Sequence, residues 1–287
     1  MNSIFKVLLV LSALSSIQAY SDLVVYSDRA PDRFTGAIAD YEKANNESVV
    51  VVMFDNYGKI VERLQAEGVH SPADLVITKD LVYLKDLKNK DLLQSFDSSP
   101  VVEGVPAYMR ALNNEWVALA IRARTFVYNP SFLSKSDLTT YADLADPKWE
   151  GGLCVRTSNS SYNQALVAGL IEQHSYETAK EIVAGWVKNL AAAPFSGDTA
   201  VIQAVAEGQC AIGLVNHYYY AGIKAKEPNF PVELAFANQG AEGAFMNGTG
   251  LALLKTSKQK ESAQKLLEAM LSEKNQLEIS EIGRAHV

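Results

Sequence analysis

Short apolar runs and amphipathic segments alternate along the first part of this chain. Consecutive apolar residues are typical of buried strands, whereas apolar residues spaced three or four apart are typical of helices that cover a sheet. The strand candidates span 23–26, 49–54 and 73–78, and the helical segments span 33–44, 59–66 and 81–87. This order of strand and helix predicts a mainly parallel sheet with helices on its faces.

A second α/β series follows two strand candidates at 116–121 and 126–128, which the segment Arg122-Ala123-Arg124 separates. Its strands span 152–156, 211–215 and 251–254, and its helices span 163–173, 176–191, 198–206 and 259–272. No Pro/Ser-rich linker divides the two series. We therefore predict a two-lobed α/β fold, in which hinge strands join two mainly parallel sheets flanked by helices. The N-terminal lobe would span 20–122, completed by 246–280, and the C-terminal lobe would span 123–245.

The first 19 residues have the features of a secretory signal peptide. Lys6 supplies the positive charge, residues 7–14 form a short apolar core, and Ala19 is a small residue at the cut. The apolar run is too short to span a bilayer as a helix. We therefore expect a protein that is exported to a bacterial periplasm and does not insert into the membrane.

Residues 281–287 break the pattern of the preceding helix and predict no new element. The run 282–287 can also be encoded by the sequence of a common sequencing adapter. We therefore interpret 281–287 as a non-native tail on a truncated chain, and we expect the helical tail that would follow to be missing.

The charge and the cysteines narrow the classes of partner. A net charge of −7 without a basic block argues against nucleic acid. Cys154 and Cys210 are the only cysteines, and both fall close to strand candidates of the second series. In an oxidising compartment they predict a disulfide, although two buried free thiols would fit the same pattern. Neither has a Cys or His neighbour at zinc-ligand spacing.

The sequence favours a binding protein over an enzyme. It contains no Gly-x-Ser-x-Gly, no phosphate-binding loop and no His-Glu-x-x-His motif, and its four histidines are scattered. We therefore predict no catalytic residues.

Tyrosines gather in the segment 216–220, directly after the apolar run 211–215. A strand at 211–215 would deliver these phenols to the carboxyl edge of a sheet, where open α/β folds bind ligands. A phenol has an ordinary pKa of about 10, but a trivalent cation strongly favours the phenolate, a hard oxygen donor that suits ferric iron. An aromatic cluster packed between two layers would fit the same residues.

A series of short motifs, in order and spacing, makes the chain resemble the periplasmic ferric-ion-binding proteins of bacterial ABC importers, from about residue 22 to residue 280. These motifs are Tyr26-Ser27-Asp28-Arg29, Glu67-Gly68, Ser71-Pro72-Ala73-Asp74, Arg122-Ala123-Arg124, Tyr128-Asn129, Asp146-Pro147-Lys148-Trp149, Ser161-Tyr162-Asn163-Gln164, Asn189, Asp198-Thr199, Ala206-Glu207-Gly208 and Asn216-His217-Tyr218-Tyr219.

The resemblance implies a two-lobed periplasmic binding protein of type II that closes over Fe(III) and delivers it to an inner-membrane ABC permease. It implies a monomer, and Tyr162, Tyr218 and Tyr219 match the ligand tyrosines of the family. The hydroxyl-rich run before Tyr162 could bind an anion at a helix N-terminus, for which Ser158 is the candidate, or could serve only as a helix cap.

The first lobe departs from part of the family. Ala30 and Pro31 stand where many members have a histidine or a histidine-tyrosine pair, and Lys79 stands where others have a glutamate. This pattern resembles a tyrosine-only branch in which an arginine holds carbonate or bicarbonate beside the metal. Arg29 would then be the anion clamp, with Arg122 as a second candidate, since a planar guanidinium matches a planar oxyanion.

We expect other polar residues near the site to have structural roles. We interpret Arg124 as part of a solvated ion pair beside the hinge strands, and His217 as a structural residue on the far side of the strand end from the tyrosines. The reserve oxygen donors, each interpreted first as structural, are Asp28, Tyr57 and Asp80.

A second function class remains open on the same scaffold. An organic-solute binder for a polyamine, thiamine or a phosphorylated sugar would share the fold. Its site would contain a cation–π cage or an anion-binding nest instead of converging phenols.

Overall fold

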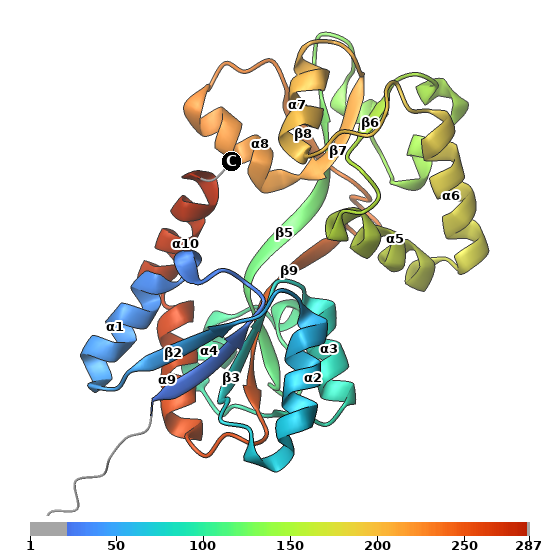
Figure 1. Ribbon diagram of the computed structural model, residues 1–287. Coiled ribbons are helices and arrows are strands. Elements are labelled where there is room, and N and C mark those ends of the chain that lie inside the picture. Colours follow the sequence, from blue (N-terminus) through green and yellow to red (C-terminus); the bar gives the residue numbers. More distant parts are fainter. Residues whose placement is uncertain (1–21, 286–287) are drawn as a thin grey trace, which may run out of the picture.

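The computed structural model describes residues 22–285, which form two α/β lobes connected by two long strands (Figure 1). The signal peptide expected at 1–19 lies outside the described residues. In the N-terminal lobe, β1 (Leu23–Ser27) pairs in parallel with β2 (Val49–Met53) on one side and β3 (Leu75–Thr78) on the other. The remaining elements of this lobe are α1 (Thr35–Asn45), α2 (Tyr57–Glu67), α3 (Leu81–Asn89), β4 (Leu93–Gln94), α4 (Ser99–Gly104) and α9 (Lys260–Leu271).

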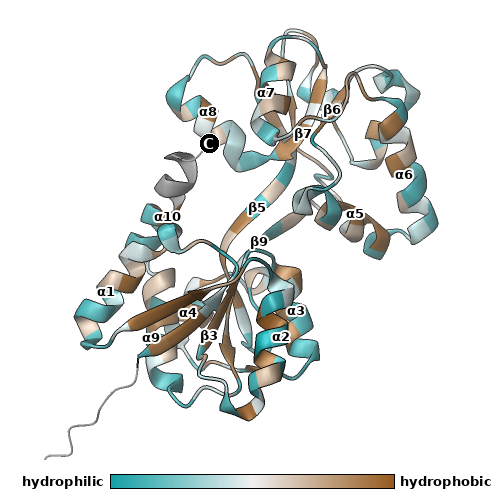
Figure 2. Cartoon of the chain, viewed as in Figure 1, coloured by the Kyte–Doolittle hydropathy of each residue, from teal (hydrophilic) through white to brown (hydrophobic). Residues whose placement is uncertain are grey.

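The apolar runs of the first lobe form a sheet that is buried on both faces. Leu23, Val25, Leu75 and Ile77 pack in one cluster with residues of α1 and α9. Tyr26 and Val76 pack on the other face with residues of α2 and α3. Successive residues of a strand point to opposite faces, so continuous apolar runs fit a sheet covered on both sides. Figure 2 shows the apolar strands enclosed by helices whose outer faces are hydrophilic.

The segment predicted as two strands is one long strand, β5 (Trp116–Tyr128). β5 pairs antiparallel with β9 (Met246–Leu254) as far as Ala123, and from Arg124 onward with β7 (Ile212–Asn216). The expected interruption at Arg122 to Arg124 is wrong, because these residues keep strand partners and their charged side chains find bonding groups within the protein. The lobe boundary predicted at residues 122 and 123 coincides with this change of partner, and it stays a prediction.

The C-terminal lobe repeats the α/β arrangement. β6 (Leu153–Val155) pairs in parallel with β7, and β8 (Glu233–Phe236) pairs antiparallel with β5. Its helices are α5 (Ser161–Gln173), α6 (Tyr176–Lys188), α7 (Asp198–Ala206) and α8 (His217–Lys226). The expected two-lobed α/β class is confirmed, and the sheets are mixed because the crossing strands β5 and β9 run antiparallel to their neighbours. Short 3-10 helices lie at Pro31–Arg33, Gly68–His70, Ala107–Met109, Lys135–Asp137, Ala142–Ala145 and Pro147–Trp149.

The predicted disulfide is confirmed. Cys154 in β6 and Cys210, just before β7, are bonded, with their Cα atoms 5.9 Å apart. Both side chains are buried in a cluster with residues of α7, including Val201 and Val205. The bond therefore joins β6 to the segment just before β7, and the carboxyl ends of these two strands lead to the tyrosines.

The last described helix, α10 (Glu273–Ala285), includes residues that were expected to form no element. That expectation is wrong for 281–285, because the helical backbone continues through them. The non-native origin of 281–287 stays a prediction. α10 packs against α1 and α9 in the N-terminal lobe and against α8 in the C-terminal lobe (Figure 1), so it spans the space between the lobes. Within residues 22–285, no helix combines the length and the apolar character needed to cross a membrane.

Candidate metal centre

Tyr162 lies in the first turn of α5, which begins at Ser161, two residues before the helix start that the sequence pattern indicated. Ser160 is the N-cap of α5, and its hydroxyl accepts a hydrogen bond from the backbone N–H of Tyr162 at 3.3 Å. Serine is a favoured N-cap because its side chain satisfies a helix donor that has no partner within the helix. The cap therefore starts the helix where the loop after β6 ends, and it places Tyr162 at the carboxyl edge of the sheet.

Tyr218 and Tyr219 lie in the first turn of α8, which begins directly after β7. Because β6 and β7 are parallel neighbours, the segments that follow them meet at the same edge. The hydroxyl of Tyr218 donates a hydrogen bond to the hydroxyl oxygen of Tyr162 at 3.1 Å. The ring centroids of Tyr218 and Tyr219 are 4.5 Å apart. The structure thus brings together phenols that are 56 residues apart in the sequence.

Two guanidinium groups lie close to the Tyr162 ring. The Cζ atom of Arg122 is 5.0 Å from the ring centroid, and that of Arg156 is 5.2 Å from it. Arg122 also donates to the carbonyl oxygen of Lys79 at 2.9 Å and forms an ion pair with Asp80 at 3.3 Å. Arg122 therefore contacts both a loop of the N-terminal lobe and a tyrosine of the C-terminal lobe.

This environment separates the pKa values of the tyrosines. Burial alone would raise the pKa of Tyr162, but the hydrogen bond from Tyr218 and the charges of Arg122 and Arg29 outweigh it and lower that pKa. Burial raises the pKa of Tyr218 far above the ordinary value, and its interactions with Tyr162 and Tyr219 raise it further. Burial also raises the pKa of Tyr219. Tyr162 is thus the phenol most ready to ionise, while Tyr218 keeps its proton and donates it in a hydrogen bond.

A cavity of about 310 Å³ lies between the lobes at this point. Its polar wall contains Arg29, Arg122, Tyr162, His217 and Tyr218. The rest of its lining comes from Phe34, Leu119, Ala120, Ile121, Ala221, Thr249, Gln276 and Ile279. The lining contains no carboxylate, and among the described residues no group of three or more His, Cys, Asp or Glu side chains could hold a metal ion. The anionic donors available at this site are therefore phenolates.

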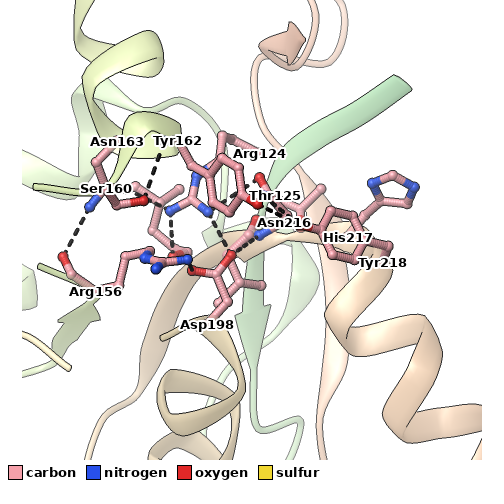
Figure 3. Close-up of polar contacts among 12 residues, drawn as sticks. Arg124, Thr125, Arg156, Ser160, Tyr162, Asn163, Asp198, Asn216, His217 and Tyr218 are labelled. Carbon is pink, nitrogen blue, oxygen red and sulfur yellow. Dashed lines mark hydrogen bonds and ion pairs between the residues drawn. The ribbon is translucent and has the colours of Figure 1, made fainter. Parts of the chain in front are cut away.

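Arg124 is buried, not solvated, and this corrects the prediction from sequence. Its side chain is 2% exposed and forms an ion pair with Asp198 at 2.9 Å (Figure 3). The partner lies 74 residues further along the chain, at the start of α7. A buried guanidinium needs a charged partner and several acceptors, which only the folded lobe supplies here. Arg156 was not predicted as a site residue, since nothing in the local sequence marks it as a neighbour of a tyrosine.

Comparison with known proteins places the chain in a family. Residues 36–285 match the family described as bacterial extracellular solute-binding protein. The chain belongs to this family. Among curated relatives of this solute-binding protein, iron uptake protein A1 of Synechocystis sp. is 34% identical over 221 residues, which cover 75% of this chain and 61% of the relative. The major ferric iron-binding protein of Neisseria meningitidis serogroup A is 26% identical over 283 residues, covering 96% of this chain and 83% of the relative.

Solved structures share the fold of this solute-binding protein. The Trichodesmium protein IdiA (FutA), in complex with iron and citrate ligands, is 35% identical with a TM-score of 0.78, and the match covers 91% of this chain and 84% of that one. The Bordetella ferric binding protein is 31% identical with a TM-score of 0.80, with coverages of 92% and 84%. These likenesses confirm the expected type II binding-protein fold and the resemblance to ferric-binding proteins. The match to the first curated relative spans less than two thirds of that relative's length.

His217 has the structural contact expected of it. Its Nδ1 atom accepts a hydrogen bond from the backbone N–H of Ala123 at 3.1 Å. Burial lowers the pKa of the imidazole, so the ring is neutral near pH 7. Its ring points away from Arg124 and Tyr162 in Figure 3. The expected place on the far side from the tyrosines is nevertheless wrong, because the His217 ring packs edge-on against the Tyr218 ring, with centroids 6.0 Å apart, and lines the same cavity. A neutral ring that is tied to β5 fits a residue that fixes the start of α8.

Tyr219 is not part of the cavity lining, and its ring packs against the buried cluster that includes Val205 and Val215. Ser158 and the three reserve donors also lie outside the lining. Ser158 is exposed, and the cap of α5 is Ser160 instead. The three reserve donors hold structural contacts of their own. Asp28 accepts from the backbone N–H of Lys79, Tyr57 donates to Asp86, and Asp80 caps α3 and pairs with Arg122. Arg29 does line the cavity, as an anion clamp requires.

Proposed function

We propose that this solute-binding protein captures Fe(III) in the cavity between its lobes, through the phenolates of Tyr162, Tyr218 and Tyr219. The observation that carries the proposal is the 3.1 Å contact between the hydroxyls of Tyr218 and Tyr162, beside the guanidinium of Arg122. An ordinary aromatic cluster would bury its rings and leave its hydroxyls in water. Here the hydroxyls meet one another at the carboxyl edge of the sheet.

The chemistry of these donors suits a hard trivalent ion. The lowered pKa of Tyr162 makes it the phenol that loses its proton most readily, so it would provide the first bond. Fe(III) would then displace the protons of Tyr218 and Tyr219, and those protons would pass to solvent. Three phenolates occupy half of an octahedral shell, which leaves positions for an anion or water.

Arg29 and Arg122 are the proposed holders of that anion, for which carbonate or bicarbonate is the candidate. Both line the cavity next to Tyr162, and a guanidinium can donate two parallel hydrogen bonds to a planar oxyanion. The N-terminus of α5 adds favourable partial charge at the same place. The exposed position of Ser158 gives no support to its role in the anion site.

The relatives support the same assignment, since they are named iron uptake protein A1 and major ferric iron-binding protein. We propose accordingly that the protein is a monomeric carrier, not an enzyme, which acts in the periplasm and delivers its cargo to an ABC permease. The likeness to AfuA of Actinobacillus pleuropneumoniae, solved with fructose-6-phosphate, is 18% identical with a TM-score of 0.64 and bears on the fold alone.

The test is the visible spectrum of the purified protein after addition of ferric citrate. Phenolate-to-iron charge transfer should give an orange to red colour, and bound iron should raise the melting temperature. Tyr218→Phe and Tyr219→Phe keep the ring but remove the donor oxygen, so each should bleach the colour. Tyr220→Phe is the matched control, because the Tyr220 hydroxyl donates to Glu233 at 3.1 Å. Colourless protein with an unchanged melting temperature would exclude Fe(III), and a gain of stability with a polyamine or sugar phosphate would support the organic-solute alternative.

A further inference from the structure

The guanidinium of Arg124 connects three elements of the C-terminal lobe (Figure 3). Its Nη1 atom donates to Asp198 Oδ2 at 2.9 Å and to Asn216 Oδ1 at 3.3 Å. Its Nη2 atom donates to Asn163 Oδ1 at 2.7 Å and to the carbonyl oxygen of Leu214 at 2.9 Å. One side chain thus joins the start of α5, the start of α7 and the end of β7.

Two of these partners are neighbours of the tyrosines. Asn163 directly follows Tyr162, and its Nδ2 atom donates to the carbonyl oxygen of Arg156 at 2.9 Å. Asn216 precedes Tyr218 by two residues, and its Nδ2 atom donates to the Tyr218 hydroxyl oxygen at 3.4 Å. Because Arg124 binds Oδ1 of each amide, it determines which way the two Nδ2 atoms point. A hydrogen-bonded chain therefore runs from Arg124 through Asn216 and Tyr218 to Tyr162.

Asp198, the carboxylate that pairs with Arg124, also contacts other residues of the site. Asp198 Oδ2 accepts from the backbone N–H of Asn216 at 2.8 Å as well as from Arg124. Asp198 Oδ1 pairs with Arg156 at 3.5 Å, and Arg156 in turn lies against the Tyr162 ring. A buried ion pair is seldom more stabilising than apolar residues of the same volume, so stability alone gives little reason for this arrangement. A better explanation is that the ion pair orients the side chains around it.

We propose that Arg124 is a positioning residue for the tyrosine site, which orients Asn163 and Asn216 so that the hydroxyls of Tyr162 and Tyr218 meet before any ligand binds. The expected effect on iron binding rests on the proposed function. The contact between the hydroxyls of Tyr162 and Tyr218, which the inference explains, is present in the protein without iron. Side chains that orient metal ligands through hydrogen bonds commonly change affinity by about 10- to 100-fold when they are removed.

The test compares Asn163→Ala with a matched control, Asn189→Ala. Asn189 is 3% exposed in the same lobe, and its amide donates to the carbonyl oxygens of Leu144 and Asp146, both at 2.8 Å. None of these three residues lines the cavity. Both variants should lower the melting temperature. Asn163→Ala should also weaken Fe(III) binding by about 10-fold or more and shift the charge-transfer band. Asn189→Ala should leave the affinity and the band as in the wild type.

Arg124→Lys provides a second variant that keeps a positive charge beside Asp198. A lysine cannot donate to Asn163 and Asn216 with the fixed geometry of a guanidinium, so it should weaken Fe(III) binding in the same direction. Equal affinities and spectra in wild type, Asn163→Ala and Arg124→Lys would overturn the proposal, as would an equal loss of affinity in Asn189→Ala.

A crystal structure of iron-free Asn163→Ala separates this inference from the proposed function. The hydroxyls of Tyr162 and Tyr218 should move out of hydrogen-bond distance, and an unchanged 3.1 Å contact would refute the positioning role. Failure of the wild-type protein to bind Fe(III) would refute the proposed function instead, and the structural comparison would still decide the role of Arg124.

Discussion

Removing the disulfide between Cys154 and Cys210 should destabilise the C-terminal lobe without dismantling the tyrosine site. The bond closes a loop with a sequence separation of 56 residues. In the chain-entropy model, a loop of that length gives the bond about 4 kcal/mol of stabilisation, because it restricts the unfolded chain. The double variant Cys154→Ala/Cys210→Ala should therefore lose about 4 kcal/mol, which corresponds to a fall in melting temperature of roughly 8–16 °C for a chain of this size.

The iron affinity of the folded variant should change by less than about 10-fold, a bound of 1.4 kcal/mol. The reason is that β6 and β7 remain paired through their backbone from Leu153 to Val155, so the edge that carries Tyr162 and Tyr218 keeps its geometry. Urea unfolding of the C-terminal lobe, followed by tryptophan fluorescence, measures the stability, and a reducing agent should lower the wild type to the level of the variant. A loss below about 1 kcal/mol, or a wild type insensitive to reduction in urea, would contradict the entropic argument.

The remaining predictions concern protonation, the anion and the contact between the lobes. Iron binding should weaken as the pH falls, because burial raises the pKa of Tyr218 and the metal must displace its proton; a titration that shows pH-independent affinity would contradict this. The same raised pKa should make the iron-free protein less stable as the pH rises above about 10, where the unfolded chain ionises first, and a thermal melt series measures this effect. Arg29→Ala should leave a coloured but weaker iron complex that responds less to bicarbonate, and a bicarbonate response equal to that of the wild type would rule out the clamp. Asp80→Ala should lower the free energy of unfolding in urea by about 3 kcal/mol, since it removes the cap of α3 and leaves the largely buried Arg122 without its carboxylate. A loss of less than about 0.5 kcal/mol would show that the ion pair of Asp80 and Arg122 is dispensable for stability.

Much of the candidate site could be predicted from local pattern. An apolar run followed by tyrosines predicts phenols at the carboxyl end of a buried strand, and β7 followed by α8 has that arrangement. The hydroxyl-rich run before Tyr162 predicts a helix start, and Ser160 caps α5 there. The cap is Ser160 and not Ser158, because several neighbouring hydroxyls can cap a helix equally well in sequence and only the geometry of the loop selects one of them.

The sequence by itself determined the kind of most elements, although it did not indicate β4, α4 or β8 and it divided β5 into two strands. Apolar runs predicted the strands and three- and four-residue spacing predicted the helices, because each of these signals acts over a few residues. The two cysteines allow only one pairing, but only the structure shows that they are bonded and are not free thiols. Only the tertiary structure decided which polar side chains are buried and whom they bind. Arg124 looks solvated beside a second arginine in the sequence, yet its charge is neutralised by Asp198, 74 residues away, and its donors are shared among α5, α7 and β7. The cost of burying a charge depends on partners that the fold assembles from distant segments, and local periodicity carries no information about them.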